Sequence, residues 1–199
     1  MAVRDLSNGY EASAREFMGR RERSRLGVAT VQMWARQLPR GGSILDLGCG
    51  SGEPIATALN GEGFSIYGVD ASPSLTAAFR RRLPRGYVAC EAIEHSCFFG
   101  KTFDGVMAIG VMFLLSGEAQ RDIIHKVSLA LKSNGRFLFT SPGQAYAWLD
   151  MLTGQKSHSL GREQYRAIFS AAGLALVGEY QDEGENHYYD TRLVRPCSR

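Results

Sequence analysis

Residues 44–54 read ILDLGCGSGEP, an apolar run with an internal aspartate that ends in a loop with three glycines. A glycine-rich loop directly after a strand lets the backbone approach a ligand closely, and it typically opens the first crossover of a parallel α/β sheet. The carboxylate of Asp46 is unexpected there, because many such loops hold a phosphate group. This stretch therefore constrains both the fold and the charge of the ligand.

The rest of the chain alternates short apolar runs with segments of helical character. Strands are expected at residues 43–47, 65–69, 87–90, 103–113, 136–140, 174–180 and 187–194. Helices are expected at residues 10–37, 53–60, 72–83, 117–131 and 161–172. This alternation favours parallel strands joined by crossover helices, whereas the last two strands lack a helix between them and should form an antiparallel hairpin. The predicted fold is α/β: a doubly wound, mostly parallel seven-stranded sheet with an antiparallel final strand.

Length and composition predict a single domain over residues 1–199, with a helical lid at residues 1–40 and a core at residues 41–199. With 44% hydrophobic and 22% charged residues, the composition is that of an ordinary soluble globular protein. No apolar run approaches the length of a membrane span, and the N-terminus lacks the apolar core of a secretion signal. We therefore expect a cytoplasmic location and no membrane partner.

The glycine-rich loop departs from the dinucleotide-binding fingerprint at one position, where Glu53 stands in place of the third glycine. In a partly dry cleft, Asp46 and Glu53 would repel a pyrophosphate at a cost on the order of a few kcal/mol. A ligand that combines a ribose with positive charge avoids this conflict. S-adenosylmethionine is such a ligand, because it carries an ammonium group, a sulfonium group and no phosphate.

Over most of its length, the sequence resembles the class I S-adenosylmethionine-dependent methyltransferases of the small, single-domain bacterial type. The stretch ILDLGCGSGEP is similar to the first motif of that family, and YGVDAS is similar to the second, with Asp70 at the end of the second strand. Two later stretches, FDGVMAIGVMFLL and LKSNGRFLFTSP, resemble the regions of the fourth and fifth strands. Asp70 follows Gly48 by about 20 residues, which is the spacing of a ribose-binding acid. The resemblance implies a Rossmann-like methyltransferase fold and S-adenosyl-L-methionine as the cofactor.

The resemblance also implies which residues hold the cofactor. Asp46 and Gly48 would lie at the methionine ammonium group, and Asp70 would accept hydrogen bonds from both ribose hydroxyls. The other expected contacts, along the loop, the adenine and the sulfonium, are Cys49, Gly50, Gly52, Ala71, Glu91, Ala92, Ile93 and Ile109. The cysteines lack the spacing of zinc ligands, so no metal ion is expected.

The cofactor motifs do not identify the acceptor, because methyl transfer mainly requires alignment, and a base only where the acceptor must lose a proton. After the fourth strand the sequence lacks the motifs of relatives that methylate nucleic-acid bases or arginine, and the acids of polyamine synthases and metal-dependent catechol enzymes. We therefore expect transfer to an O, N or S atom of a small organic molecule in an apolar, aromatic pocket. The expected lining residues are Tyr10, Phe17, Tyr146, Trp148 and Tyr188. His187, beside the turn of the last hairpin, is the candidate catalytic proton acceptor.

Three other functions remain open from the sequence. A nicotinamide-dependent oxidoreductase is disfavoured by Asp46 and Glu53. A non-catalytic sensor or partner subunit that binds S-adenosylmethionine is compatible with the motifs, and so is an RNA or protein methyltransferase recruited by the arginine-rich residues 1–40. Because acids alternate with those arginines, a solvated helix face is the simpler explanation, and we do not expect nucleic acid as a partner. We make no prediction of the oligomeric state.

Overall fold

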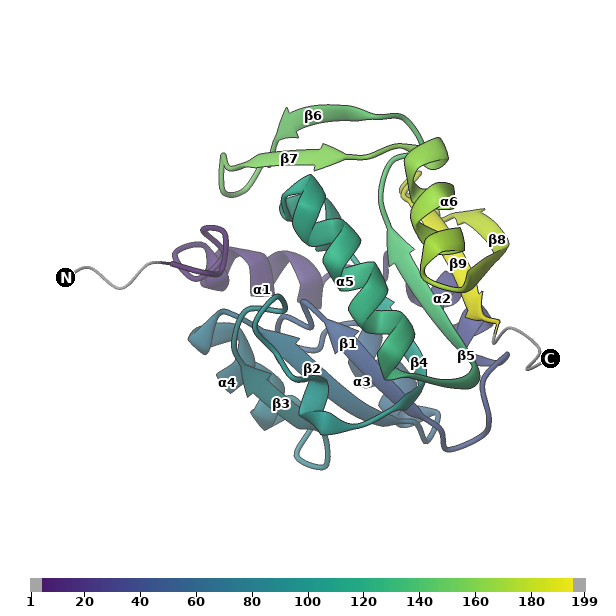
Figure 1. Ribbon diagram of the computed structural model, residues 1–199. Coiled ribbons are helices and arrows are strands. Elements are labelled where there is room, and N and C mark those ends of the chain that lie inside the picture. The colour runs from purple at the N-terminus through teal and green to yellow at the C-terminus, as the bar shows by residue number, and fades with distance from the viewer. Residues whose placement is uncertain (1–4, 195–199) are drawn as a thin grey trace.

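The computed structural model describes residues 5–194, which form a central seven-stranded sheet with the order β3-β2-β1-β4-β5-β9-β8 (Figure 1). Its strands are β1 (Ser43–Leu47), β2 (Ser65–Asp70), β3 (Tyr87–Cys90), β4 (Phe103–Ala108), β5 (Leu131–Thr140), β8 (Leu174–Gln181) and β9 (His187–Leu193). Of these seven strands, β9 runs antiparallel to both of its neighbours, β5 and β8. The predicted sheet is thus confirmed, and its antiparallel final strand lies between β5 and the edge strand β8.

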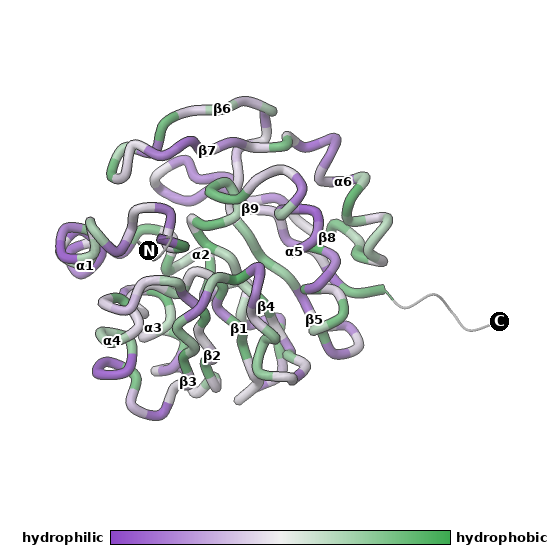
Figure 2. Tube along the Cα trace, turned by 60° about the vertical axis from the view of Figure 1, so that its left-hand side comes forward, coloured by the Kyte–Doolittle hydropathy of each residue, from purple (hydrophilic) through white to green (hydrophobic). Residues whose placement is uncertain are grey.

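Helices cover both faces of the sheet (Figure 1). One face is covered by α2 (Val28–Ala35), α3 (Ile55–Gly61) and α4 (Pro73–Arg82), and the other by α5 (Gly117–Ala130) and α6 (Arg162–Ala171). Alternate residues of each strand enter the two apolar layers: Phe137 and Phe139 of β5 pack toward α5 and α6, and Leu138 between them packs toward α2. Figure 2 shows the hydrophobic strands running through the centre of the molecule.

Serine side chains cap the first turns of two of the predicted helices, α4 and α5. The Ser72 hydroxyl accepts a hydrogen bond from the Leu75 N–H at 3.2 Å at the start of α4, and the Ser116 hydroxyl accepts one from the Ala119 N–H at 3.1 Å at the start of α5. Each bond satisfies one of the N–H groups that a helix leaves free in its first turn. The caps fix where each helix leaves the carboxyl edge of the sheet.

Three segments differ from the prediction. The expected helix at residues 10–37 is two helices, α1 (Ala14–Glu22) and α2, separated around Gly27, which has φ 76°. The fourth strand ends at Ala108 and is followed by the short 3-10 helix η2 (Met112–Leu114); a second one, η1 (Phe98–Gly100), precedes β4. The segment after β5 contains an antiparallel hairpin of β6 (Tyr146–Leu149) and β7 (Lys156–Ser159), where no strand is expected from the sequence.

The N-terminal segment and the β6–β7 hairpin both lie beyond the carboxyl ends of the parallel strands (Figure 1). They meet there, because the Tyr10 hydroxyl donates a hydrogen bond to Asp150 Oδ2 at 3.1 Å. Among residues 5–194, none of the helices combines the length and apolarity needed to cross a lipid bilayer. The arrangement leaves a covered space above the sheet, at the edge where α/β proteins bind ligands.

Candidate active site

A cavity of about 340 Å³ lies at the carboxyl ends of β1, β2 and β4. Its floor is the glycine-rich loop after β1, and its sides come from the starts of α3 and α4 and the loop after β3. Residues of the N-terminal segment, the segment around η2 and the turn between β8 and β9 complete the wall. A single space thus collects residues from distant parts of the chain, as expected at a ligand site.

Gly48 brings the first turn of the loop close to the segment that follows β4. Its φ is 69°, and a Cβ atom at this position would lie 2.7 Å from the Cβ of Val111. Both the left-handed backbone and the lack of space therefore require glycine. The tight turn leaves the backbone itself as the surface that a ligand would touch.

Asp70 ends β2 with both carboxylate oxygens held in place. Its Oδ2 accepts a hydrogen bond from the Gly50 N–H and its Oδ1 accepts one from the Ser72 N–H, each at 2.8 Å. Burial raises the pKa of the Asp70 carboxyl, and the two N–H donors oppose that shift. The carboxylate is therefore preorganised, with oxygen lone pairs that remain available to hydroxyl donors in the cavity.

Asp46 is more deeply buried, with 6% of its surface exposed. Burial raises its pKa to about 8; the nearby charge of Asp70 adds to this, and Arg21 opposes it. A cation in the cavity would favour the ionised form of Asp46, whereas an anion would meet two carboxyl groups. Burial also raises the pKa of the neighbouring Cys49 thiol, so Cys49 is a packing residue and not a nucleophile.

At the opposite end of the cavity, the β8–β9 turn forms a fixed polar corner. The Tyr188 hydroxyl donates to Asp182 Oδ2 at 2.8 Å, and Asp182 Oδ1 accepts from the Gly184 N–H at 2.9 Å and the Asn186 N–H at 3.0 Å. Although burial favours the neutral acid, hydrogen bonds from Asn186 and Tyr188 hold the pKa of Asp182 below its usual range. Burial and the Asp182 carboxylate raise the pKa of Tyr188, so the pair is a phenol bonded to a carboxylate.

The N-terminal segment closes the cavity from above. The Tyr10 and Phe17 rings meet edge to face with centroids 5.3 Å apart, and both line the space. Glu11 anchors this segment to the start of α4, where its carboxylate accepts hydrogen bonds from the Ser72 hydroxyl and from the Ser74 hydroxyl at 2.7 Å. This anchor lies close to Asp70, because the Ser72 N–H donates a hydrogen bond to Asp70 Oδ1.

Most residues predicted for the site line this cavity. The predicted cofactor residues found there are Asp46, Gly48, Cys49, Gly50, Gly52, Asp70, Ala71, Ala92, Ile93 and Ile109, and the predicted acceptor residues are Tyr10, Phe17 and Tyr188. Glu91 is not among the lining residues; its N–H donates to the Asp70 carbonyl at 3.0 Å and extends the pairing of β3 with β2.

Tyr146, Trp148 and His187 are also outside the cavity wall. Tyr146 is 50% exposed on the hairpin, and Trp148 packs behind the wall against Phe113, with ring centroids 5.3 Å apart. His187 precedes Tyr188 on β9 and therefore points to the opposite face of the sheet. A catalytic role for His187 is not supported by this position.

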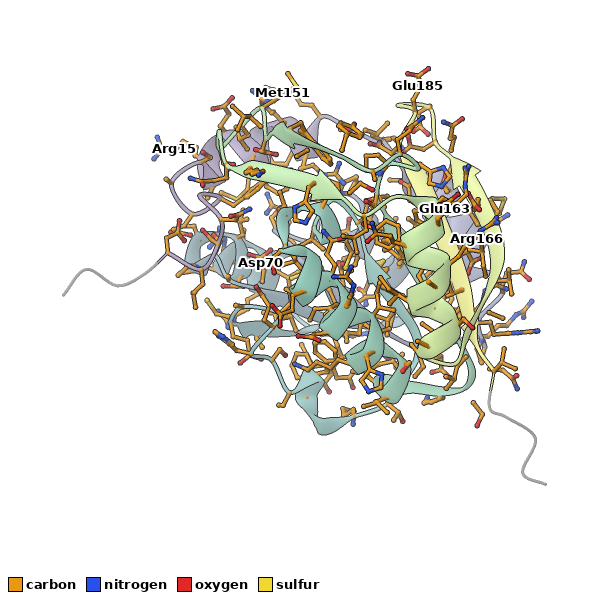
Figure 3. All side chains as sticks on the ribbon, turned by 45° about the horizontal axis from the view of Figure 1, so that its top comes forward. Arg15, Asp70, Met151, Glu163, Arg166 and Glu185 are labelled. Carbon is orange, nitrogen blue, oxygen red and sulfur yellow. The ribbon has the colours of Figure 1, made fainter. Side chains whose placement is uncertain are left out.

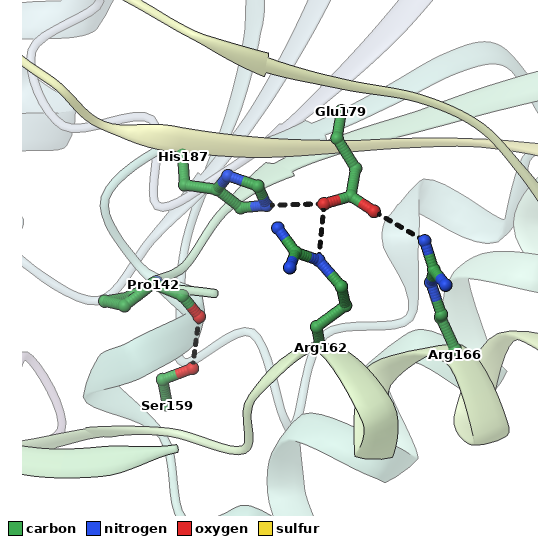
Figure 4. A network of polar contacts seen from close by, with 6 residues as sticks. All are labelled: Pro142, Ser159, Arg162, Arg166, Glu179 and His187. Carbon is green, nitrogen blue, oxygen red and sulfur yellow. Dashed lines mark hydrogen bonds and ion pairs between the residues drawn. The ribbon is translucent and has the colours of Figure 1, made fainter. Parts of the chain in front are cut away.

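His187 instead belongs to an ion-pair network on the α6 side (Figure 4). Its Nε2 lies 3.1 Å from Glu179 Oε2, and the same carboxylate pairs with Arg162 at 2.8 Å and Arg166 at 3.0 Å. In the view of Figure 3, Asp70 lies on the other side of α5 from Arg166. The network joins α6 to the sheet and does not reach the cavity.

Several residues that line the cavity are not predicted from the sequence. Asp182 directly follows the end of β8, Asp70 ends β2, and Asp46 is next to the last residue of β1. A position at the carboxyl end of a strand is therefore the signal that could have identified Asp182. Phe113 was assigned to a strand and lies on η2 instead, while Thr140 ends β5 and its hydroxyl accepts a hydrogen bond from the Gly110 N–H at 2.7 Å. Phe113 and Thr140 lie within the stretches that resemble the regions of the fourth and fifth strands, but that resemblance assigns neither of them a role in the site.

Known proteins share this architecture. A family model described as "Methyltransferase domain" matches residues 44–135. A search of curated proteins gives no match. Among solved structures, the CcbJ methyltransferase from Streptomyces caelestis superposes with a TM-score of 0.75 at 14% identity, covering 96% of this chain and 98% of that chain. A TehB-like SAM-dependent methyltransferase from Corynebacterium glutamicum gives a TM-score of 0.71 at 19% identity, with 92% and 99% covered.

A third structure, the glycopeptide N-methyltransferase MtfA complexed with S-adenosyl-L-homocysteine, gives a TM-score of 0.68 at 16% identity and covers 84% of this chain and 90% of that chain. At such identities the likeness establishes the fold, and the family match covers the segment that carries the glycine-rich loop and Asp70. The fold and the matched segment together define a Rossmann-like methyltransferase domain. Residues 44–135 thus match a methyltransferase domain, and the fold of the chain is that of the class I S-adenosylmethionine-dependent methyltransferases.

Proposed function

We propose that this protein transfers the methyl group of S-adenosylmethionine to an O, N or S atom of a small organic molecule. The observation that carries the proposal is the pair of carboxylates at the glycine-rich loop: Asp70 with both oxygens fixed, and Asp46 buried with its pKa raised to about 8. This pair suits a ligand with ribose hydroxyls at one end and a positive charge at the other. It does not suit a pyrophosphate.

The residues present fit the cofactor, because Asp46 is a buried acid that a cation would ionise and Asp70 is a fixed carboxylate beside the glycine-rich loop. Asp70 would accept the ribose hydroxyls, and Asp46 with the Gly48 backbone would hold the ammonium group. Ala71, Ala92 and Ile93 would enclose the adenine. When bound, the cofactor supplies an electrophilic methyl group on a positively charged sulfur.

The other half of the cavity would hold the acceptor. Phe113, Tyr10, Phe17 and Tyr188 offer aromatic surface there, and the lid over them would exclude water from the reacting atoms. Structural neighbours support a small acceptor: one is described as a glycopeptide N-methyltransferase and another as an amino pentose methyltransferase. Residues 1–40 acting as a lid within one domain, and a cytoplasmic location, stay predictions.

Calorimetry tests the cofactor assignment. S-adenosylhomocysteine should bind to the protein, whereas NAD⁺ and ATP should not, because each carries phosphate groups toward Asp46. Incubation with methyl-labelled S-adenosylmethionine and cell extract, followed by mass identification of the labelled product, then tests turnover. Cofactor binding without any labelled product would favour the sensor, and label in RNA or protein would favour a macromolecular acceptor.

A substitution at Asp70 tests the ribose contact directly. Asp70→Ala removes two charge-assisted hydrogen bonds and should weaken S-adenosylhomocysteine binding by about 1.5–3 kcal/mol. Asp122→Ala, on the exposed face of α5, is the matched control and should leave the affinity unchanged. Equal affinity of the Asp70→Ala variant and the wild-type protein in calorimetry would remove Asp70 from the cofactor site.

A further inference from the structure

Arg21 is a cation on the cavity wall without a partner of its own. It lies in the last turn of α1, is half-buried and lines the cavity. Among residues 5–194 it forms no ion pair, whereas its neighbour Arg20 pairs with Glu16 on the solvent side. A half-buried guanidinium is costly unless an anion approaches it, and its planar group suits a carboxylate or a similar anion.

The surroundings of Arg21 place it at the acceptor end. Burial lowers the pKa of its guanidinium, and the charges of Tyr188, Asp46 and Asp182 oppose that shift. Two of these three neighbours belong to the β8–β9 corner. Among the described residues Asp182 forms no ion pair with Arg21, and its oxygens accept hydrogen bonds from Gly184, Asn186 and Tyr188. Arg21 lines the same cavity as Asp46 of β1 and as Asp182 and Tyr188 of that corner.

The same end of the cavity offers no good proton acceptor. No histidine or lysine occurs among the described residues that line it. The Tyr188 phenol already donates its proton to Asp182, and the Asp182 lone pairs face other donors. Burial raises the pKa of the Tyr10 phenol, which donates to Asp150. Asp46 is the remaining carboxyl group near Arg21, and the proposed function assigns it to the ammonium group of the cofactor. An acceptor atom that had to lose a proton during attack would therefore find no free side chain at this end to take it.

We propose that the acceptor is a small organic anion, a carboxylate or a thiolate, whose charged atom lies beside Arg21. This inference rests on the proposed function and specifies its substrate class. The anion supplies the electron pair for the new bond to the methyl carbon, the carbon–sulfur bond of the donor breaks, and its electron pair stays on sulfur. No proton moves, so the reaction needs no base. Arg21 orients the anion, and the apolar walls remove its water shell.

Four probes with the same ring and different head groups test this class: benzoate, thiophenol, phenol and aniline. At neutral pH benzoate is an anion and thiophenol is largely so, whereas phenol and aniline are neutral. Binding of each probe to the complex with S-adenosylhomocysteine is measured by calorimetry, and methylation of each by mass spectrometry. We expect the two anions to bind about 10- to 100-fold tighter than the neutral pair, the range of a charge-assisted hydrogen bond. Methylation of one anion and not the other decides between carboxylate and thiolate.

Arg21→Gln should reduce anion binding by the same factor, and Arg21→Lys should restore part of it. Arg20→Gln, on the same helix and exposed, is the matched control and should bind as the wild type does. A second comparison separates the acceptor from the methionine carboxylate of the cofactor. S-adenosylhomocysteine carries that carboxylate and 5′-methylthioadenosine lacks it, so Arg21→Gln should change the affinity for both nucleosides by less than about twofold.

The outcomes are distinct. Phenol or aniline binding as tightly as benzoate, or failure of all four probes to bind the complex, would overturn the proposal while leaving methyl transfer intact. A selective loss of S-adenosylhomocysteine affinity in Arg21→Gln, with 5′-methylthioadenosine unaffected, would assign Arg21 to the cofactor and overturn it equally. Wild-type protein that binds no S-adenosylhomocysteine at all would overturn both this inference and the proposed function.

Discussion

Burial of a single carboxyl group, Asp46, links ligand charge to stability. Its pKa in the folded protein is about 8, against an ordinary value of 3.8. Because the folded state favours the neutral acid, the free energy of unfolding falls as pH rises between these two values. Asp46→Asn removes this penalty and should stabilise the ligand-free protein by an amount on the order of a few kcal/mol at pH 8, and by less at pH 5. Denaturant unfolding at both pH values measures the difference.

Asp104 serves as a control, because its pKa shift has the opposite sign to that of Asp46. Although burial opposes it, hydrogen bonds from Lys132 and Ser43 hold the pKa of Asp104 below its usual value. Its stabilising effect is therefore present above the ordinary pKa and is lost as pH falls. Asp104→Asn should destabilise the protein at pH 8 and have a smaller effect near pH 3. An Asp46→Asn variant that follows the Asp104→Asn pattern would contradict the buried-acid assignment.

The sequence predicts which residues line the cavity more reliably at strand ends than at positions where the answer depends on which way a side chain points. Asp46 and Asp70 both line the cavity, because a motif fixes their distance from the glycine-rich loop. His187 was chosen as the only histidine beside the expected turn, but neighbouring strand residues face opposite sides, and Tyr188 occupies the cavity side. Glu91 does not line the cavity, and its backbone N–H continues the β2–β3 pairing.

Among the secondary-structure elements, those with strong periodicity or a cap were predictable and those held by long-range contacts were not. The β6–β7 hairpin is short, largely exposed and polar in β7, which reads KSHS. Its anchor is Gln120 on α5, whose amide donates to the His158 carbonyl at 3.1 Å and whose Oε1 accepts from the Tyr165 hydroxyl at 2.6 Å. No local pattern in residues 141–161 reports a contact with Gln120.

Removing this anchor should loosen the hairpin selectively. Gln120→Leu leaves the His158 and Leu115 carbonyls without the amide donor that they share, at a cost of about 1–3 kcal/mol for each buried group left unsatisfied. The Tyr165 hydroxyl loses Gln120 but keeps the Ser141 hydroxyl as a partner. Hydrogen exchange of residues 146–159 should therefore accelerate well beyond that of β1 and β4. Arg121→Ala, on the exposed side of the same helix, is the control. Uniform acceleration across the sheet would show that Gln120 supports the core and not the hairpin in particular.

The lid depends on a second local anchor, Glu11. Its carboxylate accepts hydrogen bonds from the Ser72 and Ser74 hydroxyls and from the Ser74 N–H at 3.1 Å, near the positive end of α4. Glu11→Ala removes these bonds, each contributing about 0.5–1.5 kcal/mol, so α1 should detach more often. Limited trypsin digestion should then cleave after Arg15, Arg20 or Arg23 several-fold faster than in the wild type. A Glu118→Ala control on α5 should not change this rate, and an unchanged rate in Glu11→Ala would mean that other contacts hold the lid.

The whole sheet joins two apolar layers, and this arrangement determines how the molecule unfolds. Phe139 is fully buried toward α6, with its ring centroid 5.0 to 5.9 Å from those of Phe137, Tyr165, Phe169 and Tyr189. Phe79 of α4 is equally buried in the other layer, in the apolar cluster that also contains residues of α2 and α3. Both apolar layers are built on the same strands. Loss of either layer would therefore remove support from the strands that hold the other layer, and the two layers should unfold together.

Phe139→Ala and Phe79→Ala should therefore each lower the free energy of unfolding by about 3–5 kcal/mol, within a single transition of unchanged denaturant slope. Leu129→Ala, which removes a side chain that is 70% exposed, should change it by no more than about 0.5 kcal/mol. S-adenosylhomocysteine at 100 times its dissociation constant should add about 2.7 kcal/mol to any variant that keeps its affinity. If fluorescence and circular dichroism reported separate unfolding transitions in either phenylalanine variant, the two apolar layers would fold independently. The cavity would then depend on the stability of one layer only.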